Sequence, residues 1–176
     1  MRLETDRIIL RNFKEEDLED FHEYCSQEGL GEMAGWKHHS DLSTSKEALY
    51  RNIKNTNIFA IEHKKDSKVI GHISINEDSE DGREDTKELG FVLNSNYHNK
   101  GIMTEALKKV IEFLFKEVEL EEIYAFYDTR NVASGEVMRK SNMIYKGTFR
   151  NFIIRDIKYD NISAYSITKK EWEDNL

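Results

Sequence analysis

The sequence contains no proline and only one cysteine, Cys25. Without proline no cis-proline turn can form, and a single cysteine allows neither an internal disulfide nor a cysteine metal cluster. Because Cys25 falls in an expected helix, we interpret it as a buried packing residue rather than a reactive thiol. The sequence also lacks a long apolar run and is charged from Arg2 onward, so neither a membrane span nor a signal peptide is expected. These absences predict a cytoplasmic protein.

Basic residues are in the minority, with 26 lysines and arginines against 34 aspartates and glutamates and a net charge of −8. This excess argues against nucleic acid or an anionic membrane surface as a partner and favours a cationic substrate. The 6 histidines show no coherent metal-ligand spacing, so no metal site is expected. The length of 176 residues predicts a single domain, residues 1–176, and leaves open whether the chain forms a homodimer.

The order of the expected elements predicts a mixed α/β fold in which strands and helices do not alternate regularly. Residues 76–86 are expected to form an acidic flexible loop and residues 169–176 a terminal turn. The expected strands are residues 7–13, 58–62, 69–75, 87–93, 123–127, 144–152 and 161–168. The expected helices are residues 14–25, a helix through residue 53 that Ser43 or Ser45 caps, a helix that begins near Thr104, and residues 131–141 with Asn131 as the cap.

The stretch from Asn99 to Thr104 joins the strand at residues 87–93 to an amphipathic helix. Backbone N–H groups at a helix N-terminus lack intrahelical partners, and a glycine turn that delivers the chain there is an arrangement that binds phosphate. Because the acidic chain cannot attract a polyanion through its overall field, these amides and Lys100 would have to hold it. The helix shows an apolar stripe at Leu107, Val110, Ile111, Leu114 and Val118, and supporting ion pairs are expected at Glu105/Lys109 and Glu112/Lys116.

The letters of this region are more specific than its periodicity. E-L-G-F-V-L, a short gap and H-N-K-G-I-M-T-E-A-L resemble the acetyl-CoA loop of the GNAT acetyltransferases. The likeness is strongest to the branch that acetylates the N-termini of ribosomal proteins. The family pattern [QR]-x-x-G-x-[GA] falls on His98, Gly101 and Met103, so only the central glycine matches strictly. Two further segments also resemble family patterns, namely Asn131 to Ser134 as N-x-x-S and Tyr159 with the run A-Y-S-I.

The resemblance implies a GNAT-like central mixed sheet, mostly antiparallel, with helices on both faces. It also implies acetyl-CoA as co-substrate and an acetyl-CoA-dependent N-acetyltransferase that works by direct transfer in a ternary complex. The acceptor would be a primary amine, either a protein N-terminus or a small cationic amine such as a polyamine or an aminoglycoside. The residues expected at the cofactor are Phe91, Val92, Leu93, Asn99, Lys100, Gly101, Ile102, Met103, Thr104 and Asn131.

Acetyl transfer to an amine needs a base, because an alkylammonium with a pKa of roughly 10.4 is almost fully protonated near neutral pH. Glu88 is the candidate base, acting directly or through water, and the alternative is an exposed edge-strand glutamate paired with a lysine. His39 is the rival base, since an imidazole titrates near neutral pH. Ser134 is the candidate acid for the leaving sulfur, or it only satisfies the first turn of its helix. Met138 takes the place of the tyrosine acid found in other family members.

Four side chains are candidate walls of an acceptor pocket, although aromatic residues at such positions more often belong to the core. They are Trp36, His39, Phe152 and Tyr159. Two other functions remain as alternatives: a non-catalytic acyl-CoA-binding module, and a nucleotide-binding enzyme. The nucleotide-binding enzyme is disfavoured because neither G-x-x-x-x-G-K-[ST] nor G-x-G-x-x-G occurs in the sequence.

Overall fold

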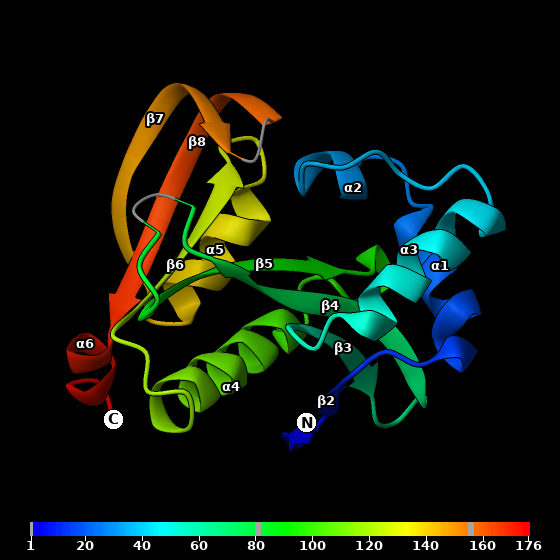
Figure 1. Cartoon of the computed structure of the whole chain (residues 1–176), viewed down its shortest axis with the longest axis horizontal. Coiled ribbons are helices and arrows are strands. Elements are labelled where there is room, and N and C mark those ends of the chain that lie inside the picture. The colour runs from blue at the N-terminus through cyan, green and yellow to red at the C-terminus, as the bar shows by residue number, and fades with distance from the viewer. Residues whose placement is uncertain (1, 80–81, 155–156) are drawn as a thin grey trace. The chain divides into compact units, whose positions relative to one another are not determined.

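A computed structural model describes residues 2–79, 82–154 and 157–176 of the chain (Figure 1). The chain folds into two compact units, the first formed by Met1–Ser74 with Phe91–Ala106 and the second by Ile75–Gly90 with Leu107–Leu176. Three elements run from one unit into the other: strands β4 (Lys68–Glu77) and β5 (Thr86–Leu93) and helix α4 (Ile102–Lys116). The single domain predicted from the sequence stays a prediction.

The predicted fold class is confirmed. The strands form one sheet in the order β1-β2-β3-β4-β5-β6-β8-β7, in which β5 and β6 pair in parallel and most other neighbours pair antiparallel. The other strands are β1 (Arg2–Glu4), β2 (Ile8–Arg11), β3 (Ile58–His63), β6 (Glu122–Asp128), β7 (Ile144–Ile154) and β8 (Ile157–Thr168). The other helices are α1 (Leu18–Cys25), α2 (Leu30–Met33), α3 (Leu42–Lys54), α5 (Val132–Lys140) and α6 (Lys169–Glu173).

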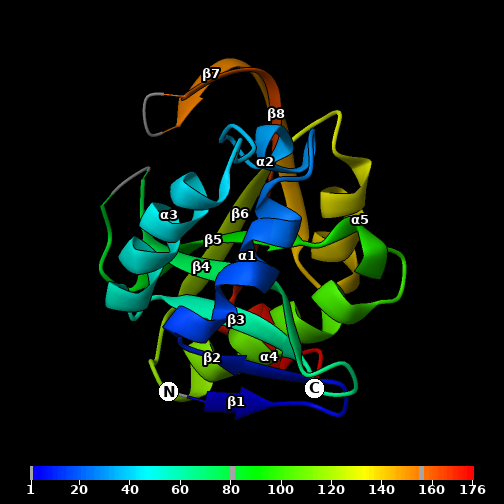
Figure 2. The same ribbon diagram turned by 90° about the vertical axis from the view of Figure 1, so that its right-hand side faces the viewer.

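In the first unit, helices α1 and α3 lie side by side over one face of the strands (Figure 2). Their apolar side chains form one continuous core with side chains from the three neighbouring strands β3, β4 and β5. Alternate residues of a strand lie on the same face of the sheet, so each strand can contribute to this core. Cys25 is 1% exposed in this core, and its burial raises the pKa of the thiol, which confirms the predicted packing role. The core residues are Phe13, Phe21, Tyr24, Cys25 and Leu49 with Ala60 of β3, Val69 of β4 and Val92 of β5.

Strands β4 and β5 approach each other closely at Gly71. A β-carbon at this position would lie 2.2 Å from the carbonyl oxygen of Val92 and 3.0 Å from the α-carbon of Leu93. Both neighbouring atoms belong to the backbone of β5, which cannot rotate away as a side chain could. Glycine is therefore the residue that lets β4 lie this close to the strand that leads into the candidate cofactor loop.

His72 packs against the aromatic rings of the first unit's core and hydrogen-bonds through Nδ1 to the hydroxyl of Tyr24 at 2.9 Å. Burial lowers the pKa of His72 from 6.5 to about 4, and burial also lowers the pKa of His39. Between pH 6.5 and about pH 4, His72 is therefore protonated in the unfolded chain and neutral in the folded chain. We expect the free energy of unfolding to fall as the pH drops through this range, with a His72 contribution of about 2 kcal/mol by about pH 5.

The variant His72→Asn tests this expectation, because an amide can hydrogen-bond Tyr24 but does not titrate. Urea unfolding of the parent and the variant near pH 7 and near pH 5 should show a smaller loss of stability in the variant. If both proteins lose the same stability between the two pH values, other groups cause the acid sensitivity.

In the second unit, β6 pairs with β5 on one side and with β8 on the other, and helix α5 packs at Gly135 against the ring of Tyr127. A β-carbon at Gly135 would lie 2.8 Å from this ring, so the glycine permits the close packing. The predicted cap is confirmed, since the side chain of Asn131 accepts a hydrogen bond from the amide of Ser134. Asn142 ends the helical region with φ 65°, the left-handed conformation expected of it.

Some local predictions were wrong. Asp41 caps α3 by accepting a hydrogen bond from the amide of Thr44, whereas Ser45 is buried inside the helix. Val118 lies beyond the end of α4 and is 45% exposed. The pair Glu112/Lys116 forms as predicted, but Lys109 also pairs with Glu112 and leaves Glu105 to another partner.

Candidate functional site

Helix α4 starts where the predicted phosphate-binding turn ends. The amide of Glu105 donates to the carbonyl of Gly101 at 3.0 Å, which makes Gly101 the N-cap. Asn99 and Gly101 have φ values of 60° and 71°, so the turn uses two left-handed residues in three positions. A β-carbon at Gly101 would find only the Arg7 guanidinium, at 3.7 Å, so the space beside this turn is open.

The backbone amides from Asn99 to Thr104 donate no hydrogen bond to any other residue that the structure describes. Because a helix N-terminus carries partial positive charge, these groups are free to receive an anion. The residues predicted to hold the cofactor in this segment are therefore brought together, with their donors available. A diphosphate is an anion of the charge and size that such an arrangement binds.

The start of the loop is fixed by buried polar contacts. Asn94 is 0% exposed, and its side chain accepts from Gln27 at 2.9 Å and donates to Glu23 at 2.8 Å. Gln27 also accepts from the amide of Ser95 at 3.0 Å, and His98 bonds through Nε2 to the carbonyl of Leu93 at 2.8 Å. The loop therefore leaves β5 on a rigid path, tied to the end of helix α1.

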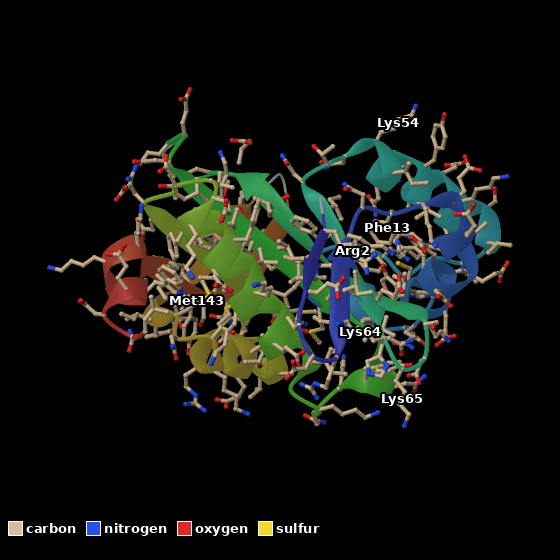
Figure 3. The ribbon with its side chains drawn as sticks, turned by 90° about the horizontal axis from the view of Figure 1, so that it is seen from below. Arg2, Phe13, Lys54, Lys64, Lys65 and Met143 are labelled. Atoms are coloured by element: carbon tan, nitrogen blue, oxygen red, sulfur yellow. The ribbon has the colours of Figure 1, made fainter. Side chains whose placement is uncertain are left out.

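The first turn of α4 is held from below by Arg7, which sequence reasoning missed. Its guanidinium donates to Glu105 at 2.6 Å and to the carbonyl of Lys100 at 2.8 Å. Burial acts to raise the pKa of Glu105, but hydrogen bonds from Thr5 and Arg7 outweigh it and the pKa is lowered. Lys64, labelled in Figure 3, donates to the carbonyl of Thr5 at 2.7 Å, in the connection between β1 and β2 that also carries Arg7.

Lys100, the predicted phosphate ligand, lies along the loop. Its ammonium group donates to the carbonyl of Asn96 at 2.8 Å and sits 5.1 Å from the centre of the Tyr97 ring. The residue is exposed, so the ammonium group can exchange this carbonyl for an anion at little cost.

Three predicted cofactor residues precede the loop on β5. Phe91 is half-buried, whereas Val92 and Leu93 are buried. Glu88 belongs to the same strand, so one continuous strand carries the candidate base and the candidate cofactor residues.

Glu88 is not an exposed edge-strand glutamate. It is 6% exposed, on a strand that has neighbours on both sides, and it lies in register with Tyr124 of β6. The nearby lysine, Lys87, pairs instead with Glu77 at 2.6 Å. The hydroxyl of Ser79 donates to Oε2 of Glu88 at 2.9 Å. A carboxylate buried in this way is held for a purpose other than a surface ion pair.

The Ser79 contact belongs to a larger polar network in the second unit that the sequence did not reveal. The amide of Ser79 donates to the Tyr124 hydroxyl at 2.7 Å, and that hydroxyl donates to Oδ1 of Asp78 at 2.9 Å. Burial, as the largest cause, raises the pKa of Tyr124 to about 12, so the phenol keeps its proton. Ser79 lies in the segment that was predicted to be a flexible loop, part of which falls outside the described residues.

Ser134 is placed at the first turn of α5 by the Asn131 cap. Its amide donates to Oδ1 of Asn131 at 3.3 Å, so the cap does not use the Ser134 hydroxyl. Ser134 is half-buried, and its hydroxyl makes no hydrogen bond with another residue that the structure describes. It remains available to a ligand, as a candidate acid must be.

His39 and Trp36 belong to the first unit, and their rings are in tilted contact with centres 5.4 Å apart. His39 bonds through Nδ1 to the hydroxyl of Ser45 at 2.8 Å, and His22 bonds to the same hydroxyl at 2.7 Å. Burial, followed by the neighbouring His22, lowers the pKa of His39. Trp36 packs against the core cluster and fills the space beside Gly31, which supports the core interpretation of this tryptophan.

Phe152 and Tyr159 are paired in the β7–β8 hairpin, and Phe152 lines a pocket of about 410 Å³ in the second unit. The pocket joins an aromatic wall to charged groups of both signs, and Tyr124 and Asp78 belong to its lining. The rings of Phe149 and Phe126 make tilted contacts with the ring of Phe152, with ring centres 5.3 and 6.1 Å away. The charged lining residues are Asp78, Arg83, Glu122 and Lys146.

Among the residues that the structure describes, no helix has the length and apolar character needed to cross a membrane.

The sequence matches the family described as "Acetyltransferase (GNAT) domain" over residues 7–144. It is 28% identical over 172 residues to the uncharacterized N-acetyltransferase YnaD of Bacillus subtilis, a match that covers 98% of this chain and 99% of YnaD. The structure superposes on a GNAT-family acetyltransferase from Bacillus anthracis with a TM-score of 0.86 and 25% identity, covering 97% of this chain and 99% of the other.

Two more distant structures share the fold. A ribosomal-protein-S5-alanine acetyltransferase from Vibrio fischeri has a TM-score of 0.76 at 21% identity, with 98% of each chain covered. The Microcin C7 self-immunity acetyltransferase MccE, solved with acetyl-CoA and AMP, has a TM-score of 0.77 at 20% identity, with 93% of each chain covered. Since the family match spans most of the sequence, the chain belongs to the GNAT acetyltransferase family, whose co-substrate is acetyl-CoA.

Proposed function

We propose that this protein transfers an acetyl group from acetyl-CoA to a primary amine by direct attack in a ternary complex. The observation that carries the proposal is the set of backbone amides from Asn99 to Thr104 at the start of α4, which donate to no other described residue. They fit the diphosphate of coenzyme A, with Lys100 as an additional cation. Phe91, Val92 and Leu93 of β5 and Asn131 at the cap of α5 are proposed to contact the rest of the cofactor.

In this proposal Glu88 takes the proton from the acceptor ammonium, directly or through water, because a protonated amine cannot attack a carbonyl. The amine nitrogen then bonds to the acetyl carbon as the carbon–sulfur bond breaks. The Ser134 hydroxyl donates to the departing sulfur. Two observations support these roles: Glu88 is buried, and the Ser134 hydroxyl has no hydrogen-bond partner among the described residues. His39 is the weaker base candidate, since its Nδ1 is already engaged by Ser45.

Ser134→Ala should lower kcat by about 10-fold and leave the stability almost unchanged, because the cap comes from Asn131 rather than from the serine hydroxyl. Thermal unfolding and steady-state kinetics of the variant test this. Asn131→Ala is the control for loss of the cap and should cost about 1 kcal/mol of stability. Full turnover in Ser134→Ala would leave the serine with a structural role only.

The acceptor is proposed to be a protein N-terminus or a small cationic amine. A protein N-terminus is favoured by the motif likeness and by the fold shared with a ribosomal-protein-S5-alanine acetyltransferase. The pocket in the second unit also supports it, because aromatic walls with charges of both signs suit a peptide better than a polycation. Trp36 and Tyr159 remain proposed contacts of the acceptor. We place the reaction in the cytoplasm, where the lone buried thiol needs no disulfide partner.

The test is release of free thiol from acetyl-CoA in the presence of peptides with different N-termini, polyamines and aminoglycosides. Turnover with one class and not the others identifies the acceptor. Coenzyme A binding without turnover on any amine would favour the alternative, a non-catalytic acyl-CoA-binding module. Absence of coenzyme A binding would refute both functions.

A further inference from the structure

We propose that Ser79, Tyr124 and Asp78 form a proton relay that carries the proton taken up by Glu88 to the water of the adjacent pocket. This inference rests on the proposed function, in which Glu88 is the base. A buried base that has taken a proton must lose it before the next turnover. Glu88 is 6% exposed, so its own contact with bulk water is small.

The network supplies a continuous path of oxygens away from Glu88. The Ser79 hydroxyl lies 2.9 Å from Oε2 of Glu88 and 3.3 Å from the Tyr124 hydroxyl. The Tyr124 hydroxyl lies 2.9 Å from Oδ1 of Asp78. In the resting arrangement, the serine proton points to Glu88 and the phenol proton points to Asp78. The amide of Ser79 donates to the tyrosine oxygen and fixes the distance between the two residues.

The proposed transfer balances at every atom. Once Glu88 is protonated, the Ser79 hydroxyl turns from Glu88 toward the Tyr124 oxygen. The protonated Glu88 then gives its proton to the Ser79 oxygen, the Ser79 proton passes to the Tyr124 oxygen, and the Tyr124 proton passes to the Asp78 carboxylate. Each hydroxyl loses one O–H bond and gains one, so a single proton moves from Glu88 to Asp78. No oxidant or other reactant is needed. The new Ser79 proton already points to Glu88, the Tyr124 hydroxyl turns back toward Asp78, and Asp78 releases its proton to water in the pocket.

The far end of the path reaches the pocket of about 410 Å³, which Asp78 and Tyr124 both line and which is large enough for several waters. Charged groups from other elements face the same space, so the proton arrives in a polar environment. They are Arg83, whose amide donates to Asp78 at 3.1 Å, Glu122 of β6 and Lys146 of β7. The high pKa of Tyr124 fits a hydroxyl that passes protons on and does not ionise.

All three residues act through Glu88 and are positioning residues, so the test needs a readout that a structural brace would not change. Tyr124→Phe removes only the hydroxyl, and Ser79→Ala removes only the serine oxygen. We expect each variant to lower kcat by about 10-fold while KM for acetyl-CoA stays unchanged. In mixtures of light and heavy water, a plot of kcat against the deuterium fraction should be curved for the parent protein, because several protons move in the same step. In Tyr124→Phe this dependence should become linear.

Ser79→Thr is the matched control, because it keeps the hydroxyl on an exposed loop residue and should restore kcat and the curved deuterium dependence. Unchanged kcat in both Tyr124→Phe and Ser79→Ala, in an enzyme that Glu88→Gln disables, would overturn the relay and leave the base in place. Equal losses of kcat in Ser79→Ala and Ser79→Thr would also overturn it. If the parent protein acetylates no amine, the relay falls together with the proposed function.

Discussion

Glu88→Gln is expected to lower kcat for acetyl transfer by about 100-fold while the affinity for coenzyme A stays the same. A positioned base contributes roughly 10²- to 10⁴-fold, and an amide cannot take up the proton of the acceptor ammonium. The change is nearly isosteric, and the amide oxygen can still accept the hydrogen bond from Ser79. Steady-state thiol release measures the chemical step, and calorimetry with coenzyme A measures binding separately.

Glu77→Gln is the control for this experiment. It makes the same chemical change on the neighbouring strand β4, at a side chain that is 77% exposed and pairs with Lys87. An exposed ion pair contributes little stability, so this variant should behave like the parent. Equal kcat for Glu88→Gln and the parent would remove Glu88 from the mechanism and return attention to His39 or water.

Gly101→Val is expected to weaken coenzyme A binding by about 10- to 100-fold, which corresponds to about 1.4 to 2.7 kcal/mol. Gly101 adopts φ 71°, and a β-branched residue in this region is strained by roughly 1–3 kcal/mol. The strain changes the direction of the amides at the start of α4, and the new side chain enters the open space beside them. Calorimetry with coenzyme A and a thermal unfolding curve measure the two effects.

Gly82→Val is the matched control, since Gly82 also has a positive φ, 66°, with nothing within 4 Å of its missing β-carbon. It should lose similar stability and bind coenzyme A normally. If Gly101→Val binds coenzyme A as tightly as this control does, the phosphate-binding role of the loop is wrong.

Much of the fold follows from local chemistry that the sequence displays. The strand at residues 87–93 is short, apolar and bounded by polar residues, and β5 occupies Thr86–Leu93. Asn131 caps its helix, and Asn142 adopts the left-handed conformation, because both effects need only neighbouring backbone groups. The stripe from Leu107 to Leu114 is buried as its period predicts.

The features that sequence reasoning missed depend on residues far apart in the chain. Arg7 supports the first turn of α4 across 98 positions, so no local spacing could have indicated that Glu105 would turn away from Lys109. The cap of α3 shows the same effect at short range. Ser45 was a reasonable cap by composition, but His22 and His39 occupy its hydroxyl inside the fold, and Asp41 takes the cap instead.

Sequence reasoning proposed individual candidate residues of the site but not the hydrogen bonds between them. Glu88 could be singled out as a carboxylate on an apolar strand, whereas its hydrogen-bond partner Ser79 looked like one polar residue in an acidic loop. Tyr124 looked like an ordinary strand residue, because only the parallel register of β5 and β6 brings it beside Glu88. Register between strands is set by the packing of the whole sheet and leaves no mark on one strand alone.

The contact at Gly71 limits how this protein can be redesigned. Substitution of Gly71 in a library of β4 variants is not expected to yield useful proteins, because any side chain there would collide with the main chain of Val92. The separation of the two strands here is therefore set by peptide groups and is insensitive to how the surrounding apolar side chains are exchanged. Substitutions aimed at the proposed acceptor pocket are better directed to Phe149 and Phe152, whose side chains line it.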